Sequence, residues 1–142
     1  MRDLLHKVGV IPFITKGTRI AVLFVTSQTR GRWILPKGRL KSGESHEEGC
    51  KREAMEEASV SGKILKNFPI TVLVTKSIKG TIARSPVTYY PFVVQEQHDN
   101  WPEQQKRERH WALLDDVAKV VSRDDYLSLL KLFEHLTPWI KD

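Results

Sequence analysis

The chain has 142 residues, of which 40% are hydrophobic and 28% are charged. This length suits one domain with its own core, so we expect residues 1–142 to form a single domain. The composition excludes a disordered or fibrous protein, and no apolar run approaches the roughly 20 residues of a membrane span. The net charge of +6 favours anionic partners such as nucleotides, inositol phosphates or nucleic acid.

The only cysteine, Cys50, excludes an internal disulfide and suits a reducing compartment, so we expect a cytoplasmic protein. The first residues, MRDLLHKVGVIPF, combine scattered charges with a short apolar stretch and lack a small-residue cleavage site. This pattern favours mature protein over a signal peptide.

Two β-rich apolar runs open the predicted fold, at Val8–Thr15 and Arg19–Thr26, and Lys16-Gly17 between them is a hairpin signal. Pro12 argues against a central position for the first run, because proline cannot donate a ladder hydrogen bond. A short apolar piece at residues 33–36 then leads into a glycine-containing loop.

Ser45 and Glu48 form a capping-box pattern, which predicts a helix that starts near His46 and ends at residues 60–62. Residues 64–68, 71–78 and 87–97 are typical of strands, the last two joined through Gly80. Ser122 with Asp125 predicts the cap of a second helix. Its apolar residues recur at spacings of three and four and predict one buried stripe: Tyr126, Leu129, Leu130, Phe133 and Leu136. The order of elements predicts a mixed α/β sandwich.

Three glutamates gather on the first predicted helix. At about 100° per residue, Glu53, Glu56 and Glu57 share an arc of about 100°. A neighbouring stripe of small apolar residues is suited to pack on a sheet: Cys50, Ala54 and Ala58. The carboxylates are therefore expected at the edge of the buried face, where a cleft would lie.

Glutamates on a helix usually face water, and Arg52 with Glu56 is an ordinary pair at i,i+4 spacing. Three carboxylates on one arc, directly after a glycine loop, instead favour a site for Mg²⁺ or Mn²⁺, which prefer oxygen ligands. Gly49, one turn before Glu53, would let a loop or ligand come close. Such a site indicates phosphate-ester or anhydride chemistry.

The window from Gly38 to Val60 resembles the Nudix box, G-x5-E-x7-R-E-U-x-E-E-x-G-U, where U is a bulky apolar residue. The residues on their positions are Gly38, Glu44, Arg52, Glu53, Glu56, Glu57 and Val60. Two positions depart from the pattern, since Ala54 is a small apolar residue and Ser59 replaces the final glycine. The segments WILPKGRLKSGES and WPEQQKRERHWALLDDVAKVV are similar to the diphosphoinositol polyphosphate and diadenosine polyphosphate branch of this superfamily.

The resemblance implies an α/β fold, the Nudix α/β/α sandwich with a mixed sheet, and a metal-dependent hydrolase. It implies that Glu53, Glu56 and Glu57 bind Mg²⁺ or Mn²⁺, together with the backbone carbonyl of Gly38. Arg52 and Glu44 would pair and hold the loop against the helix. For the general base, Glu53 is the first choice and Glu96 the second, an exposed strand-end role being the alternative for Glu96.

Basic residues near the glycine loop add a second expectation. Lys37, Arg39 and Lys41 are predicted to contact the phosphates of the substrate that do not react, with solubility as the alternative role. Trp33 and Trp111 are expected to pack, while the basic run Lys106–Arg109 is expected to face solvent.

We therefore predict a pyrophosphohydrolase acting on a small-molecule polyphosphate, either diadenosine polyphosphates or diphosphoinositol polyphosphates. The alternatives are another nucleoside diphosphate derivative (a damaged nucleoside triphosphate, a nucleotide sugar or a capped RNA) and a non-catalytic Nudix scaffold that binds a nucleotide or RNA. A nucleic-acid partner ranks below the small molecule, no membrane partner is expected, and the sequence does not indicate an oligomeric state.

Overall fold

The computed structural model describes residues 6–28, 31–100, 103–104 and 106–140, with the backbone alone at 76–78. The strands are β1 (Lys7–Lys16), β2 (Arg19–Thr26), β3 (Trp33–Ile34), β4 (Lys37–Arg39), β5 (Val60–Ile64), β6 (Ile70–Ile78), β7 (Thr81–Gln97) and β8 (Arg109–Leu113). The helices are α1 (His46–Ala58) and α2 (Asp124–Leu136), with the short 3₁₀ helices η2 (Leu114–Lys119) and η3 (Thr137–Trp139).

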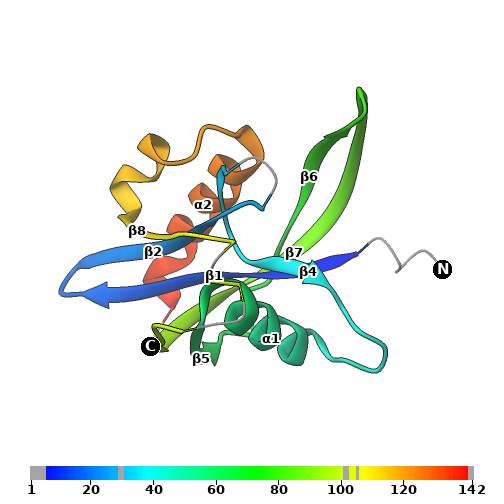
Figure 1. The fold of residues 1–142 in the computed structure, drawn as a ribbon. Coiled ribbons are helices and arrows are strands. Elements are labelled where there is room, and N and C mark those ends of the chain that lie inside the picture. The colour runs from blue at the N-terminus through cyan, green and yellow to red at the C-terminus, as the bar shows by residue number, and fades with distance from the viewer. Residues whose placement is uncertain (1–5, 29–30, 101–102, 105, 141–142) are drawn as a thin grey trace.

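The strands form one mixed sheet whose main path runs β3-β2-β1-β7-β5. Strand β4 also pairs with β1, β6 with β7, and β8 with β2. The β1–β7 pair is parallel and the other pairs are antiparallel. Helix α1 packs on β1 and β5, and α2 packs beside β6, so helices lie on both sides of the sheet (Figure 1). The predicted α/β sandwich with a mixed sheet is confirmed.

Strand β1 is central, which corrects the expectation drawn from Pro12. On one side, β1 pairs with β4 through Lys7–Gly9 and with β2 through Phe13–Lys16. Pro12 falls in the gap between these two partners, where no antiparallel ladder needs its missing N–H. On its other side, β1 runs parallel to β7, and residues 8–13 are buried.

Helix α1 begins as predicted, because the Ser45 side chain accepts from the Glu48 N–H and Glu48 accepts from the Ser45 N–H. Its predicted end is wrong by a few residues. The helix stops at Ala58, since Ser59 adopts a left-handed conformation (φ 54°, ψ 48°) and turns the chain at once into β5. The strand predicted at 64–68 is therefore also misplaced, and only residue 64 belongs to β5.

The second helix lies close to its predicted place, but the predicted cap is wrong. Helix α2 follows its N-cap residue Arg123, whose side chain makes no capping hydrogen bond to the first turn. Asp125 is engaged elsewhere, since it accepts from Arg123 and from the Thr75 N–H at the edge of β6. The predicted apolar stripe is buried from Tyr126 to Phe133, and Leu136 is half-buried.

Two further features complete the frame around the site. The hairpin turn at Gly80 is confirmed, although β7 begins at Thr81 rather than at Val87. The glycine loop after Trp33 contains a short strand, β4, that holds residues 37–39 against β1. In the described part of the chain, neither helix has the length and apolar character that a membrane crossing requires.

Candidate metal centre

Helix α1 carries the three glutamates along the rim of its contact with the sheet. The small residues Cys50, Ala54 and Ala58 are fully buried, as the sequence predicted. Glu53 and Glu57 are only 6% and 7% exposed, and Glu56 is half-buried. Two buried carboxylates on one helix are costly unless cations or hydrogen-bond donors compensate them.

Strand β4 approaches this helix so closely that glycine at position 38 leaves room for the Glu53 side chain. A Cβ added there would collide with the carboxylate of Glu53. One turn earlier on α1, a Cβ at Gly49 would lie 2.5 Å from the side chain of Leu40. The expectation that Gly49 admits a loop is confirmed, and both glycines bring residues 37–41 against the carboxylates.

Arg52 is the first anchor of the carboxylates. Its Nε and Nη2 donate to Glu44 at 2.7 and 2.9 Å, the bidentate pair that the resemblance implied. Nη1 donates to Glu53 at 2.8 Å and to Glu56 at 3.3 Å. These hydrogen bonds from Arg52 lower the pKa of Glu44 to about 2.

Burial raises the pKa of the Cys50 thiol to about 12, which keeps this thiol neutral and suits its role in the core.

Glu57 is held differently. Its Oε1 accepts from the backbone N–H of Lys37 at 3.3 Å, and its Oε2 lies 3.6 Å from Nη2 of Arg107. Burial raises the pKa of Glu57 above its usual range, while the charge of Arg107 opposes this shift. Ionised Glu57 is therefore under-compensated in this structure, because neither donor makes a short contact.

The donor set fits Mg²⁺ or Mn²⁺ by chemistry. Carboxylates and a nearby backbone carbonyl are hard oxygen ligands, and a divalent cation would compensate the buried charge. Within the described residues, no three acidic, histidine or cysteine side chains converge on one point. Arg52 Nη1 lies within reach of both Glu53 and Glu56, so this arginine supplies positive charge to the cluster.

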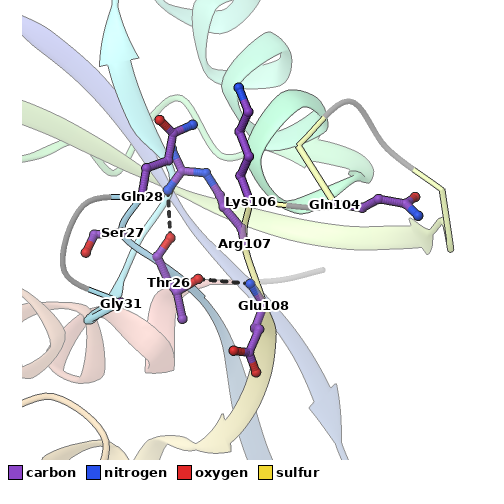
Figure 2. Close-up of a pocket in the computed structure, with 8 residues that line it drawn as sticks. All are labelled: Thr26, Ser27, Gln28, Gly31, Gln104, Lys106, Arg107 and Glu108. Carbon is purple, nitrogen blue, oxygen red and sulfur yellow. Dashed lines mark hydrogen bonds between the residues drawn. The ribbon is translucent and has the colours of Figure 1, made fainter.

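A polar pocket of about 300 Å³ opens next to Arg107 (Figure 2). Its lining residues are Thr26, Ser27, Gln28, Gly31, Gln104, Lys106, Arg107 and Glu108. Arg107 also contacts Glu57, so its side chain stands between this pocket and the end of α1.

The expectation that the basic run faces solvent is wrong for two of its members. The Arg107 side chain is only 9% exposed, and Arg109 donates to the carbonyls of Ala58 and His98 at 3.0 and 2.8 Å. Lys106 is exposed, as expected. Sequence reasoning missed Arg107 because two of its partners, Thr26 and Glu57, come from distant segments.

The predicted phosphate-binding residues border the cluster on the β4 side. Arg39 and Lys41 have exposed side chains, while the Arg39 carbonyl accepts from Arg52 and the Lys41 N–H donates to Glu44. Lys37 is half-buried, and its charge acts on Glu57. Basic side chains of residues 37–41 therefore lie beside the acidic side chains of α1.

Glu96 is not bonded to the α1 carboxylates among the described residues. It is exposed on β7 and pairs in register with Ser61 on β5. Among the described residues, no hydrogen bond or ion pair joins Glu96 to the α1 carboxylates. Trp33 and Trp111 are half-buried against the core, and Trp111 Nε1 also donates to Gln97.

The chain is similar in sequence to known proteins. The chain is 36% identical over 124 residues to Nudix hydrolase 18, mitochondrial, of Arabidopsis thaliana, covering 82% of this chain and 68% of that protein. It is 31% identical over 130 residues to Nudix hydrolase 21, chloroplastic, of the same plant, covering 89% and 64%. The chain thus spans about two thirds of the length of these relatives.

Solved structures share the fold. A crystal structure of C. elegans Ap4A hydrolase has a TM-score of 0.72 at 21% identity, covering 94% of this chain and 98% of that one. The NUDIX domain of Shewanella oneidensis NrtR, in complex with ADP ribose, has a TM-score of 0.71 at 21% identity, covering 95% and 89%. The family model of the NUDIX domain matches residues 4–136. The chain therefore belongs to the Nudix family of hydrolases, whose members act on phosphorus-containing acid anhydrides and generally use divalent metal ions.

Proposed function

We propose that this protein is a pyrophosphohydrolase that uses Mg²⁺ or Mn²⁺ to cleave a phosphoanhydride bond. The observation that carries the proposal is the pair of buried carboxylates, Glu53 and Glu57, at the rim of α1 beside β4. With Glu56 and the Gly38 carbonyl they would hold the metal. The metal would neutralise developing charge on the phosphate and lower the pKa of an attacking water.

The protein side chains have separate roles in this proposal. Arg52, fixed by Glu44, orients Glu53 and Glu56. Glu53 is the first choice for the general base, because its buried carboxylate lies against Gly38 and interacts with Glu57. Glu96 is the weaker candidate, since its side chain is exposed and has no bond to the cluster among the described residues.

The proposed substrates are diadenosine polyphosphates or diphosphoinositol polyphosphates. Such substrates carry more negative charge than a metal site alone offsets, and Lys37, Arg39 and Lys41 border the cluster on one side. Lysine attracts phosphate as a point charge and arginine through a forked contact. The similarity to an Ap4A hydrolase supports the fold that this site requires.

A second candidate is a different nucleoside diphosphate derivative. The NUDIX domain of Shewanella oneidensis NrtR was crystallised with ADP ribose, which has a single diphosphate link. A non-catalytic scaffold is less well supported, because a pure binder has no need of all three box carboxylates together with the arginine that orients them.

For the location we keep the cytoplasm as a proposal, supported by the single buried thiol. The two Arabidopsis relatives named above are called mitochondrial and chloroplastic. Fluorescence microscopy of the full protein carrying a C-terminal tag would test it, and an organellar signal would contradict it.

One assay tests the activity and separates the substrate classes. Purified protein is incubated with Mg²⁺ and a panel of diadenosine polyphosphates, diphosphoinositol polyphosphates and ADP-ribose, with EDTA added in parallel. We expect metal-dependent product from the polyphosphates. Product from ADP-ribose alone would favour the second candidate, and binding without turnover across the panel would favour a scaffold.

A further inference from the structure

Arg107 is nearly buried, is anchored by two short hydrogen bonds and forms one longer ion pair with Glu57. Its Nε donates to Glu103 at 2.6 Å, its Nη1 donates to the Thr26 carbonyl at 2.7 Å, and its Nη2 lies 3.6 Å from Glu57. Figure 2 shows the side chain reaching across the pocket towards the end of β2. A long side chain fixed at two points loses most of its freedom, so its third nitrogen has a defined position.

The arrangement repeats that of Arg52 with different residues. Arg52 is held by Glu44 and by the Arg39 carbonyl, and it presents Nη1 to carboxylates of α1. Arg107 is held by a glutamate and a backbone carbonyl and presents Nη2 to the next carboxylate on the same helix. Unlike Arg52, it lies outside the motif and comes from the segment before β8.

The two oxygens of Glu57 are approached from two sides. The Lys37 N–H of β4 lies against Oε1, and Arg107 lies against Oε2. The Glu103 side chain that holds Arg107 also accepts from Gln28 Nε2 at 3.1 Å. The orientation of Glu57 therefore depends on the end of β2 and on the segment before β8.

We infer that Arg107 is a positioning residue that orients Glu57 as a metal ligand. The inference rests on the proposed metal function of Glu57, and it assigns a role to a residue outside the Nudix box. Partners beyond the direct ligands typically change metal affinity by about tenfold to a hundredfold when they are removed.

Equilibrium Mn²⁺ binding tests this role without depending on turnover. Free Mn²⁺ is measured by electron paramagnetic resonance in titrations of the wild type, Arg107→Met and Arg107→Lys. Lys106→Met is the matched control, since it removes one positive charge from the adjacent, exposed position. Circular dichroism confirms that each variant is folded, and Arg107→Lys keeps the charge if Arg107→Met folds poorly.

We expect Arg107→Met to weaken Mn²⁺ binding by about tenfold or more, Arg107→Lys to recover part of the loss, and Lys106→Met to stay within about twofold of the wild type. The direction of the change in Mn²⁺ affinity distinguishes the two possible roles of Arg107. If Arg107 only repelled the metal through its charge, its removal would tighten Mn²⁺ binding. Tighter or unchanged binding in folded Arg107→Met would overturn the inference alone. Absence of Mn²⁺ binding by the wild type would instead overturn the proposed metal site on which it rests.

Discussion

The two arginines that hold the α1 carboxylates differ in how well they compensate them. Arg52 donates to Glu53 of α1 at 2.8 Å and forms a short bidentate contact with Glu44 of the preceding loop, whose pKa falls to about 2. Arg107 lies 3.6 Å from Glu57, and burial raises the pKa of that carboxyl. Direct hydrogen bonds to a cation favour an ionised carboxylate, whereas a longer contact leaves the cost of burial largely in place. The first anchor is thus already complete in this structure, and Glu57 is where a divalent cation would compensate the most charge.

Replacing Arg52, the first anchor, should have the largest effect on activity. Lysine keeps the charge in Arg52→Lys but lacks the planar fork that contacts Glu44, Glu53 and the Arg39 carbonyl together. We expect kcat to fall by about tenfold or more under saturating Mg²⁺, the scale typical of disturbed metal-site partners. Wild-type kinetics in Arg52→Lys would mean that the planar fork of Arg52 is not needed to orient the metal ligands.

Removing the basic residues of β4 tests whether this side of the cluster contacts the substrate. We expect Lys37→Ala and Arg39→Ala to raise KM several-fold for longer polyphosphates and less for short ones, because each removed charge matters more to a more highly charged ligand. Added salt should weaken binding in the same order. Steady-state kinetics on a series of chain lengths measures this, and equal effects on all lengths would leave these residues a solubility role.

Acid titration should sharpen the contrast between the two anchors. The pKa of Glu44 is about 2 in the folded protein and about 4.3 in an unfolded chain, so its pairing stabilises the fold above about pH 4 and is lost towards pH 2. We expect the difference in free energy of unfolding between wild type and Arg52→Met to shrink over that range. Urea denaturation at a series of pH values measures it, and a pH-independent difference would contradict the role of the pair.

Substitutions of Ser59 at the end of α1, two residues after Glu57, should have the smallest effect on stability. Ser59 is fully buried with φ 54°, and its hydroxyl donates to the Asn100 carbonyl. Ser59→Gly and Ser59→Ala both lose this hydroxyl, but glycine alone adopts the left-handed conformation without strain. We expect Ser59→Gly to be more stable than Ser59→Ala by about 1 kcal/mol in urea denaturation. Equal stability of the two variants would argue against a strained helix end.

Local signals predicted the parts of the molecule that adjacent residues determine. The capping box located the start of α1, the hairpin signals located β1 and β2, and the spacing of Glu53, Glu56 and Glu57 placed them on one rim. A single domain over residues 1–142 stays a prediction, as do the metal-binding and catalytic roles.

The misplaced elements depend on contacts between distant segments. Pro12 is compatible with a central strand only because β4 and β2 share one side of β1. Asp125 does not cap α2 because it binds the edge of β6. Arg107 belongs to a basic run of the kind that usually faces solvent, yet two of its partners come from β2 and α1. Sequence periodicity carries no information about such contacts between distant segments.

Glu57→Gln tests the central claim, a divalent metal site on α1, most directly. Glutamine keeps the shape of the side chain but removes the charge that would hold the metal, so turnover of a polyphosphate at ordinary Mg²⁺ should fall by at least roughly tenfold. The melting temperature without metal should stay unchanged or rise, because a buried and poorly compensated carboxylate has been removed. Wild-type turnover by folded Glu57→Gln at the same Mg²⁺ concentration would contradict the account.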